Sequence, residues 1–245
     1  MEYVVETYEL TKRYGRETVV DRLSLQVRSG EIFGFLGPNG AGKTTTLLML
    51  LGLSEPSGGR AEVLGLDPVT KPLKIKSQVG YLPENIGFYG DMTALENLTY
   101  VADLNRLYEI EDLKAETLRL VGLYEVKDRQ VATFSRGMRQ RLGLAEVLIK
   151  KPRLIFLDEP TLGLDPDGIA TMLELIERLP REMGLTVILS SHLLHLVARV
   201  ANRVAILKKG QLLAMGTVDE LAEEANLNRD LEEIYRFYFK KDIRE

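Results

Sequence analysis

Hydrophobic positions follow three different patterns along the chain. Apolar and polar residues alternate over residues 4–10 and 19–27, which predicts two β-strands with one buried face each. Short apolar runs at residues 32–36, 61–64 and 78–82 predict three further strands. We therefore expect the first third of the chain to be rich in strands and to include an N-terminal antiparallel β subdomain.

The middle of the chain, from about residue 92 to residue 150, has the spacing of amphipathic helices. Thr93 and Glu96 have the spacing of a capping box at the start of a first helix, and Gly122 is placed to end a second. Ser135 is suited to cap a third helix, which ends before Pro152. Helices without intervening strands predict an inserted α-helical subdomain.

Strands and helices alternate again after residue 153, as in α/β proteins. The apolar runs predict strands at residues 154–157 and 186–190, helices at 166–179 and 192–200, and a hairpin at 204–207 and 211–215. We therefore expect three parts. They are an α/β core from residues 1–84 and 151–218, a helical insertion at residues 85–150 and a C-terminal helical tail at residues 219–245.

A glycine-rich loop separates the strand predicted at residues 32–36 from a helix that follows it. The loop reads G-x-x-x-x-G-K-T, in which glycines let backbone N–H groups surround a phosphate and the helix adds its positive dipole end. Lys43 can reach the outer phosphates, and the Thr44 hydroxyl can ligate Mg²⁺. This P-loop predicts a nucleotide-binding α/β core, although an incidental glycine-rich turn is the alternative. The residues assigned to nucleotide binding here are Gly37, Pro38, Asn39, Gly40, Ala41, Gly42, Lys43, Thr44 and Thr45.

Two carboxylates follow the apolar strand predicted at residues 154–157. Beside a phosphate loop, Asp158 can hold Mg²⁺ directly or through water, and Glu159 can polarise an attacking water. His192 follows the strand predicted at residues 186–190, at the edge of an open α/β sheet where ligands bind. We assign Lys43, Glu159 and His192 to catalysis. The alternatives are an acidic turn at the strand end and a histidine with no catalytic role.

A short polar segment, residues 134–141, opens the third predicted helix. Ser135 and Gly137 stand at the helix N-terminus, where backbone N–H groups can bind phosphate. A capped helix with a solvated basic face explains the same residues. Their chemistry alone does not choose between these two interpretations.

Composition restricts the class of protein further. The 245 residues include no cysteine, which excludes disulfides, thiol metal sites and a thiol nucleophile. The net charge of −4 argues against a nucleic-acid partner bound mainly through phosphate contacts. No apolar run approaches the roughly 20 residues that span a bilayer. We therefore expect a cytoplasmic protein, which would need another chain to act across a membrane.

In their order and spacing, these motifs resemble those of the ATP-binding subunits of ATP-binding cassette (ABC) transporters. The P-loop is similar to the Walker A motif of that family, and residues 155–159 are similar to Walker B with its catalytic glutamate. Residues 134–138 stand where the family has its Leu-Ser-Gly-Gly-Gln signature, and residues 162–165 resemble the D-loop. His192 is similar to the switch histidine.

The resemblance implies how the protein would work. ATP and Mg²⁺ would bind between two cassettes paired head to tail, in a homodimer or with a homologous chain. Ser135 and Gly137 would contact the γ-phosphate held by the other subunit, while Tyr14 stacks on adenine and Glu84 ligates the metal together with Thr44 and Asp158. A transmembrane permease would hold the dimer at the cytoplasmic face of the membrane.

Two motifs depart from the family pattern. Glu84 stands where the family has glutamine, and in the signature Arg136 replaces a glycine and Met138 a glutamine. Such variants resemble single-domain cassettes of ABC-2-type exporters, so we expect export. These residues do not predict which compound is transported. A weakly hydrolysing, nucleotide-gated binding module remains an alternative. A cassette protein of DNA repair is another alternative. Such proteins have long coiled coils between the two Walker motifs, and the segment between Lys43 and Arg153 is too short for them.

Overall fold

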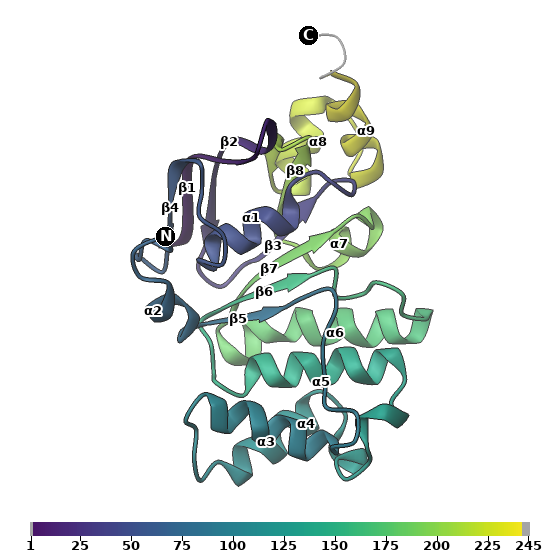
Figure 1. The fold of residues 1–245 in the computed structure, drawn as a ribbon. Helices are drawn as coiled ribbons and strands as arrows, with labels where there is room; N and C mark the ends of the chain where they lie inside the picture. The colour runs from purple at the N-terminus through teal and green to yellow at the C-terminus, as the bar shows by residue number, and fades with distance from the viewer. Residues whose placement is uncertain (1, 242–245) are drawn as a thin grey trace.

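The computed structural model describes residues 2–241 and places the strands in two separate sheets (Figure 1). The N-terminal sheet is antiparallel and has the order β2-β1-β4, as expected for the strand-rich start of the chain. Gly15, with a φ of 59°, forms the turn between its two long strands. The strands of this sheet are β1 (Tyr3–Tyr14), β2 (Glu17–Arg28) and β4 (Gly58–Val63).

The second sheet forms the centre of the molecule and has the order β5-β6-β7-β3-β8-β9. Its first five strands in this order are parallel, and β9 returns antiparallel to β8 through the expected hairpin. Every residue of β3, β6 and β7 is buried, which explains why these strands are apolar runs and not alternating segments. The six strands are β3 (Ile32–Leu36), β5 (Val79–Leu82), β6 (Leu154–Asp158), β7 (Thr186–Ser191), β8 (Arg203–Lys208) and β9 (Gln211–Gly216).

Two hydrophobic layers cover the two faces of the central sheet. One layer packs the N-terminal sheet and α1 against residues such as Phe33 and Phe156. The other packs the remaining long helices against Ile155, Leu157 and their neighbours. Among residues 2–241, no helix combines the length and the apolar character that crossing a bilayer requires. The helices of the core are α1 (Lys43–Leu50), α2 (Pro72–Lys76), α6 (Pro166–Met183) and α7 (Leu194–Val200).

The inserted helices lie at the end of the molecule opposite the N-terminal sheet (Figure 1). The capping box of Thr93 and Glu96 is present at the first helix, and the Ser135 hydroxyl accepts the N–H of Met138 at the third, as the sequence predicts. The helices here are α3 (Ala94–Leu104), α4 (Glu111–Leu120) and α5 (Arg136–Leu148), with short 3₁₀ turns η1 (Tyr124–Val126) and η2 (Val131–Thr133).

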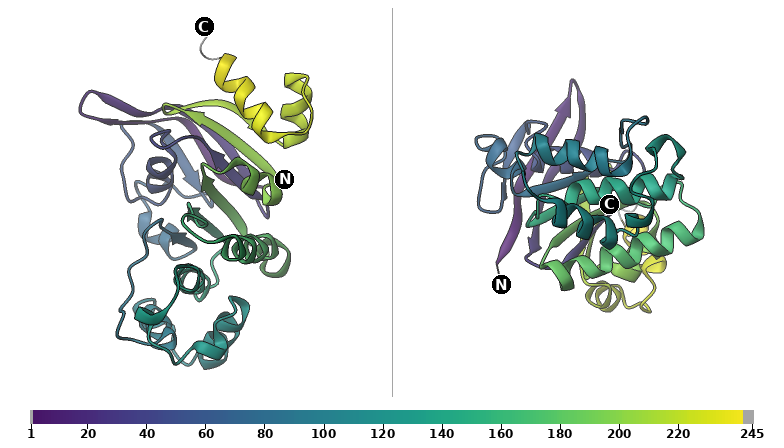
Figure 2. Two further views of the ribbon diagram at one scale, coloured as in Figure 1. Left: turned by 90° about the vertical axis from the view of Figure 1, so that its right-hand side faces the viewer. Right: turned by 90° about the horizontal axis from the view of Figure 1, so that it is seen from below.

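The C-terminal segment packs at the other end of the molecule, away from α3 and α4 (Figure 2). It forms α8 (Val218–Ala225) and α9 (Leu231–Lys241). Ile234 and Tyr238 are buried against the core, in keeping with the helical spacing of the tail. The apolar pattern indicated no helix at α2, whereas α8 lies in the helical tail expected from residue 219, and Thr217 and Glu220 form a capping box that marks its start. The last four residues of the expected tail, 242–245, lie outside the described residues.

A cavity of about 180 Å³ between α3, α5 and the end of β5 is lined by two ionisable groups, Glu146 and Lys150. The Lys150 ammonium donates to the Lys76 carbonyl at 2.9 Å. Glu146 on α5 lines it together with Tyr81 and Asn105. Burial raises the pKa of Glu146 from 4.5 to about 8. The folded protein therefore keeps a proton that the unfolded chain releases above pH 4.5. This carboxyl's contribution to stability is full below pH 4.5 and is lost as the pH rises to about 8.

We expect Glu146→Gln, which has no charge to bury, to unfold a few degrees above the parent protein at pH 8. The difference should shrink at pH 5, where the parent carboxyl is neutral in the fold. Calorimetry at both pH values measures it, with the exposed Glu116→Gln on α4 as the matched control. An equal difference at both pH values would contradict the assignment.

Candidate nucleotide-binding site

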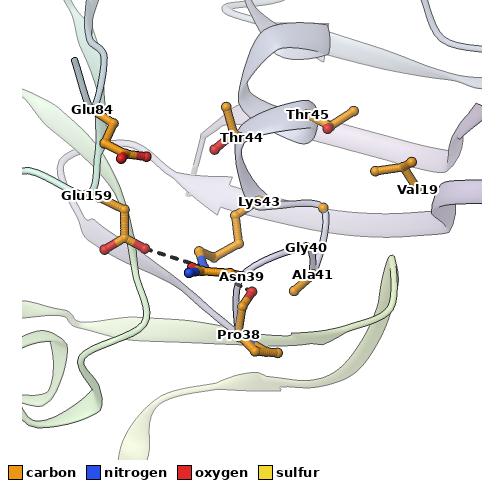
Figure 3. Close-up of a pocket in the computed structure, with 11 residues that line it drawn as sticks. Val19, Pro38, Asn39, Gly40, Ala41, Lys43, Thr44, Thr45, Glu84 and Glu159 are labelled. Atoms are coloured by element: carbon orange, nitrogen blue, oxygen red, sulfur yellow. Dashed lines mark hydrogen bonds and ion pairs between the residues drawn. The ribbon is translucent and has the colours of Figure 1, made fainter. Parts of the chain in front are cut away.

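A cavity of about 260 Å³ surrounds the glycine-rich loop (Figure 3). The structure thus brings together most of the residues that the sequence assigned to phosphate binding, with Glu84 and Glu159 on the opposite side. Val19 on β2 is a lining residue that the sequence did not indicate, because only the approach of β2 to the loop puts it there. The residues lining the cavity are Val19, Pro38, Asn39, Gly40, Ala41, Gly42, Lys43, Thr44, Thr45, Glu84 and Glu159.

The backbone of the loop depends on its glycines. Gly40 and Gly42 have φ values of 79° and 94°, in the left-handed region that favours glycine. A Cβ atom at Gly42 would lie 2.7 Å from the Val19 carbonyl oxygen, and one at Gly37 would lie 2.5 Å from the Leu207 carbonyl oxygen. The loop is therefore pressed between β2 and β8, and α1 begins directly after it at Lys43.

Lys43, Glu159 and His192 contact one another in sequence, and the first two of them line the cavity. The Lys43 ammonium donates to the Gly37 carbonyl at 2.6 Å and lies 3.4 Å from Oε1 of Glu159. The other carboxylate oxygen of Glu159 lies 2.9 Å from Nδ1 of His192. Lys43 and Glu159 are both buried, whereas His192 is partly exposed at the start of the segment that leads to α7. The three residues assigned to catalysis are therefore in one chain of contacts.

Adjacent strands of the central sheet hold the carboxylates in place. Asp158 pairs in register with Ser190 on β7, and the Ser190 hydroxyl donates a short hydrogen bond to it. Burial, and next the neighbouring charge of Asp158, raise the pKa of the Tyr81 hydroxyl to about 12, so this group stays a hydrogen-bond donor. Glu159 has a φ of 49°, a conformation that costs energy in a residue with a side chain. This turn directs its carboxylate toward Lys43 and His192, while its N–H bonds to the Ser190 carbonyl at 3.1 Å.

Comparison with known proteins identifies this arrangement. The family model described as ABC transporter matches residues 20–162.

The chain belongs to the ABC transporter family.

It is 42% identical to the bacitracin transport ATP-binding protein BcrA of Bacillus licheniformis, over 90% of this chain and 72% of that protein. It is 37% identical to the linearmycin resistance ATP-binding protein LnrL of Bacillus subtilis, over 89% of this chain and 70% of that protein. A solved ATP-binding subunit of an ABC transporter shares 30% identity with a TM-score of 0.84, covering 96% of this chain and 99% of that one. The expected fold, the family and the activity are confirmed. The chain is an ATP-binding subunit of an ABC transporter, an ATPase whose hydrolysis of ATP powers transport.

The oxygen atoms around the phosphate cavity of this ABC subunit fit Mg²⁺. Thr44 and Glu84 turn their oxygens toward the space beside Glu159 (Figure 3), whereas Asp158, the last residue of β6, is buried and does not line the cavity. Mg²⁺ takes hard oxygen ligands and is completed by substrate phosphates and waters more often than by a full protein cage. Residues 2–241 contain no group of three acidic, cysteine or histidine side chains placed to hold a metal alone. Bound there, Mg²⁺ would neutralise phosphate charge.

The three residues assigned to ATP outside the glycine-rich loop do not line this cavity of the ABC subunit. Tyr14 ends β1 with half of its surface exposed, and the Lys12 ammonium lies 4.9 Å from the centre of its ring. Ser135 and Gly137 begin α5, at the inserted helices, and do not line the phosphate cavity.

Proposed function

We propose that this chain hydrolyses ATP at the interface of a head-to-tail cassette dimer and thereby drives export through a separate membrane permease. One observation carries the proposal. The phosphate-binding half of the site is assembled within the chain, whereas Ser135 and Gly137 begin a different helix outside the cavity. A second cassette, either another copy or a homologous chain, would complete each site.

In the proposed site each residue has one role. The loop from Gly37 to Thr45 surrounds the phosphates with backbone N–H groups, and Lys43 neutralises the outer phosphates. Glu159 accepts the proton of the attacking water, since its carboxylate lines the cavity opposite the phosphate loop. His192 orients that carboxylate through the contact at 2.9 Å and reaches the γ-phosphate or the water. Thr44, Asp158 and Glu84 hold Mg²⁺, and Tyr14 stacks on the adenine ring.

The names of two relatives support export as the direction of transport. BcrA is a bacitracin transport protein and LnrL a linearmycin resistance protein, and resistance to a toxic compound fits removal from the cell. We therefore propose that the dimer sits at the cytoplasmic face of the membrane and that its permease carries an antibiotic or a similarly amphiphilic compound. No nucleic-acid partner is proposed, in keeping with the net charge of −4.

The loop after β5 is the proposed permease contact. Ile86 and Phe88 pack partly buried against the hydrophobic core, so local packing accounts for them. Tyr89 is 54% exposed, and its ring lies edge-on to that of Tyr100 with the centres 5.0 Å apart. This exposed aromatic pair supports a contact with an apolar segment of a partner.

Co-expression with the membrane protein encoded beside the gene tests the proposal. We expect a complex that survives purification, whose ATPase rate in proteoliposomes exceeds that of the isolated subunit. Cells that produce the complex should also tolerate several-fold more bacitracin-type peptide, and Glu159→Gln in the same complex should remove this tolerance. A subunit that forms no complex and hydrolyses ATP equally fast with or without the membrane protein would overturn the export proposal.

A further inference from the structure

Glu84 and Arg136, the two charged departures from the family motifs, line one cavity. This second cavity measures about 230 Å³ and lies between the loop after β5 and the first turns of α5. Glu84 and Arg136 come from segments that are more than 50 residues apart in the sequence, and both carry a charge where the family pattern has a neutral residue. The residues lining the cavity are Glu84, Asn85, Ile86, Arg136, Arg139 and Gln140.

Glu84 separates this cavity from the nucleotide site, because it lines both of them. Around the phosphates the ionisable lining residues are Lys43, Glu84 and Glu159, one cation against two carboxylates. A triphosphate adds several negative charges to a lining that is already negative. The Glu84 charge therefore opposes nucleotide binding unless a counter-charge stands close to it.

Two cations line this cavity with Glu84, and the guanidinium of one of them, Arg139, donates to the Phe134 carbonyl at 2.6 Å. Arg136 is the other, and we assign the counter-charge to it. Its guanidinium lies over Gly163, which has a φ of 68°, and a Cβ atom at that glycine would come within 2.6 Å of the guanidinium carbon. The missing side chain of Gly163 thus leaves room for Arg136. Glu84 and Arg136, both among the described residues, face the same cavity without a direct ion pair. The two side chains therefore attract each other as separated opposite charges and not through a hydrogen bond.

Gln140 adds a second polar group to the cavity. Its side chain is more than nine-tenths buried, and its amide Nε2 has no hydrogen-bond partner within the described chain. A buried amide donor without a partner is costly, so an acceptor is expected to reach it. Glu84 is the carboxylate that lines the same cavity.

We propose that Arg136, together with the Gln140 amide, is the counter-charge that offsets the negative charge of the Glu84 carboxylate beside the nucleotide phosphates. Glu84 and Arg136 then act together, because the Arg136 charge reduces the repulsion between the Glu84 carboxylate and the phosphates of ATP. Arg136 is a positioning residue in this arrangement, since it acts on the nucleotide through Glu84. The inference rests on the proposed nucleotide site and adds a determinant of its affinity.

Fluorescence titration with MANT-ATP in EDTA tests the pair without turnover and without Mg²⁺. We expect Arg136→Ala to weaken binding by about tenfold, the scale of one uncompensated charge near a polyanion. In the Glu84→Gln background the same substitution should change affinity by about twofold or less. Arg136→Lys should retain most of the affinity.

Excess Mg²⁺ should reduce the loss of MANT-ATP affinity in Arg136→Ala, because the cation offsets the Glu84 charge. Arg181→Ala, which removes an exposed positive charge on α6, is the control and should bind like the parent.

The outcomes separate the charge pair from the nucleotide site itself. An Arg136→Ala variant that melts like the parent and binds MANT-ATP equally well would overturn the pair. A double variant as weak as Arg136→Ala alone would also overturn it, because Arg136 would then act independently of Glu84. A parent protein that binds no MANT-ATP would instead overturn the proposed nucleotide site, and the pair with it.

Discussion

Glu159→Gln is expected to slow ATP hydrolysis by about 10²-fold or more, the range of a lost general base. The substitution keeps the size and shape of the side chain, but an amide cannot take the proton of the attacking water. It also leaves the fold intact, since the Glu159 backbone bonds to Ser190 are unchanged. Because ATP still binds while its cleavage is blocked, the variant should accumulate as an ATP-bound dimer.

Steady-state ATPase assays and size-exclusion chromatography with and without MgATP measure both effects. Glu116→Gln, the same chemical change at an exposed position of α4, should leave the rate and the elution volume unchanged. Unchanged turnover in Glu159→Gln would remove Glu159 from the proposed role. Slow turnover without a trapped dimer would show instead that the carboxylate acts before the two subunits close.

Ser135→Arg is expected to abolish ATP-dependent dimer formation while each monomer still binds one ATP. Ser135 lies outside the phosphate cavity of its own chain, so a large cation at this position leaves that cavity untouched. In the proposed dimer the same side chain would occupy the space of the second subunit's γ-phosphate. Equilibrium dialysis with ATP and size-exclusion chromatography of the Glu159→Gln form separate the two properties.

The substitution also removes a helix cap, which alone costs about 1 kcal/mol. Thr217→Arg is a matched control, because Thr217 caps α8 with the same type of hydrogen bond at the far end of the molecule. It should lose similar stability and still form the dimer. A Ser135→Arg monomer that no longer binds ATP would show that Ser135 serves the site of its own chain, and the head-to-tail assignment would fail.

Motifs and caps could be predicted because their information is local. The glycines of the P-loop, the capping boxes and the fully apolar strands each lie within a few consecutive residues, so spacing alone identifies them. α2 was missed because five residues are too few to show helical periodicity. Tyr14 and Val19 could not be placed from local spacing, because the paths of β1 and β2 past the loop decide which residue lines the phosphate cavity. Val19 lines it and Tyr14 does not.

By itself, the sequence determined that the chain contains a P-loop, carboxylates at a strand end and a capped signature helix, and these motifs in order predicted an ABC ATPase. Only the tertiary structure decided which of them touch. Glu159 meets His192 because β6 and β7 are neighbours in the central sheet, and Lys43 reaches Glu159 from the loop after β3, on the other side of β7. Glu84 faces Arg136 because α5 packs beside the end of β5. The physical reason is that spacing along the chain encodes local conformation, whereas strand order and helix packing arise from burying the whole hydrophobic surface at once.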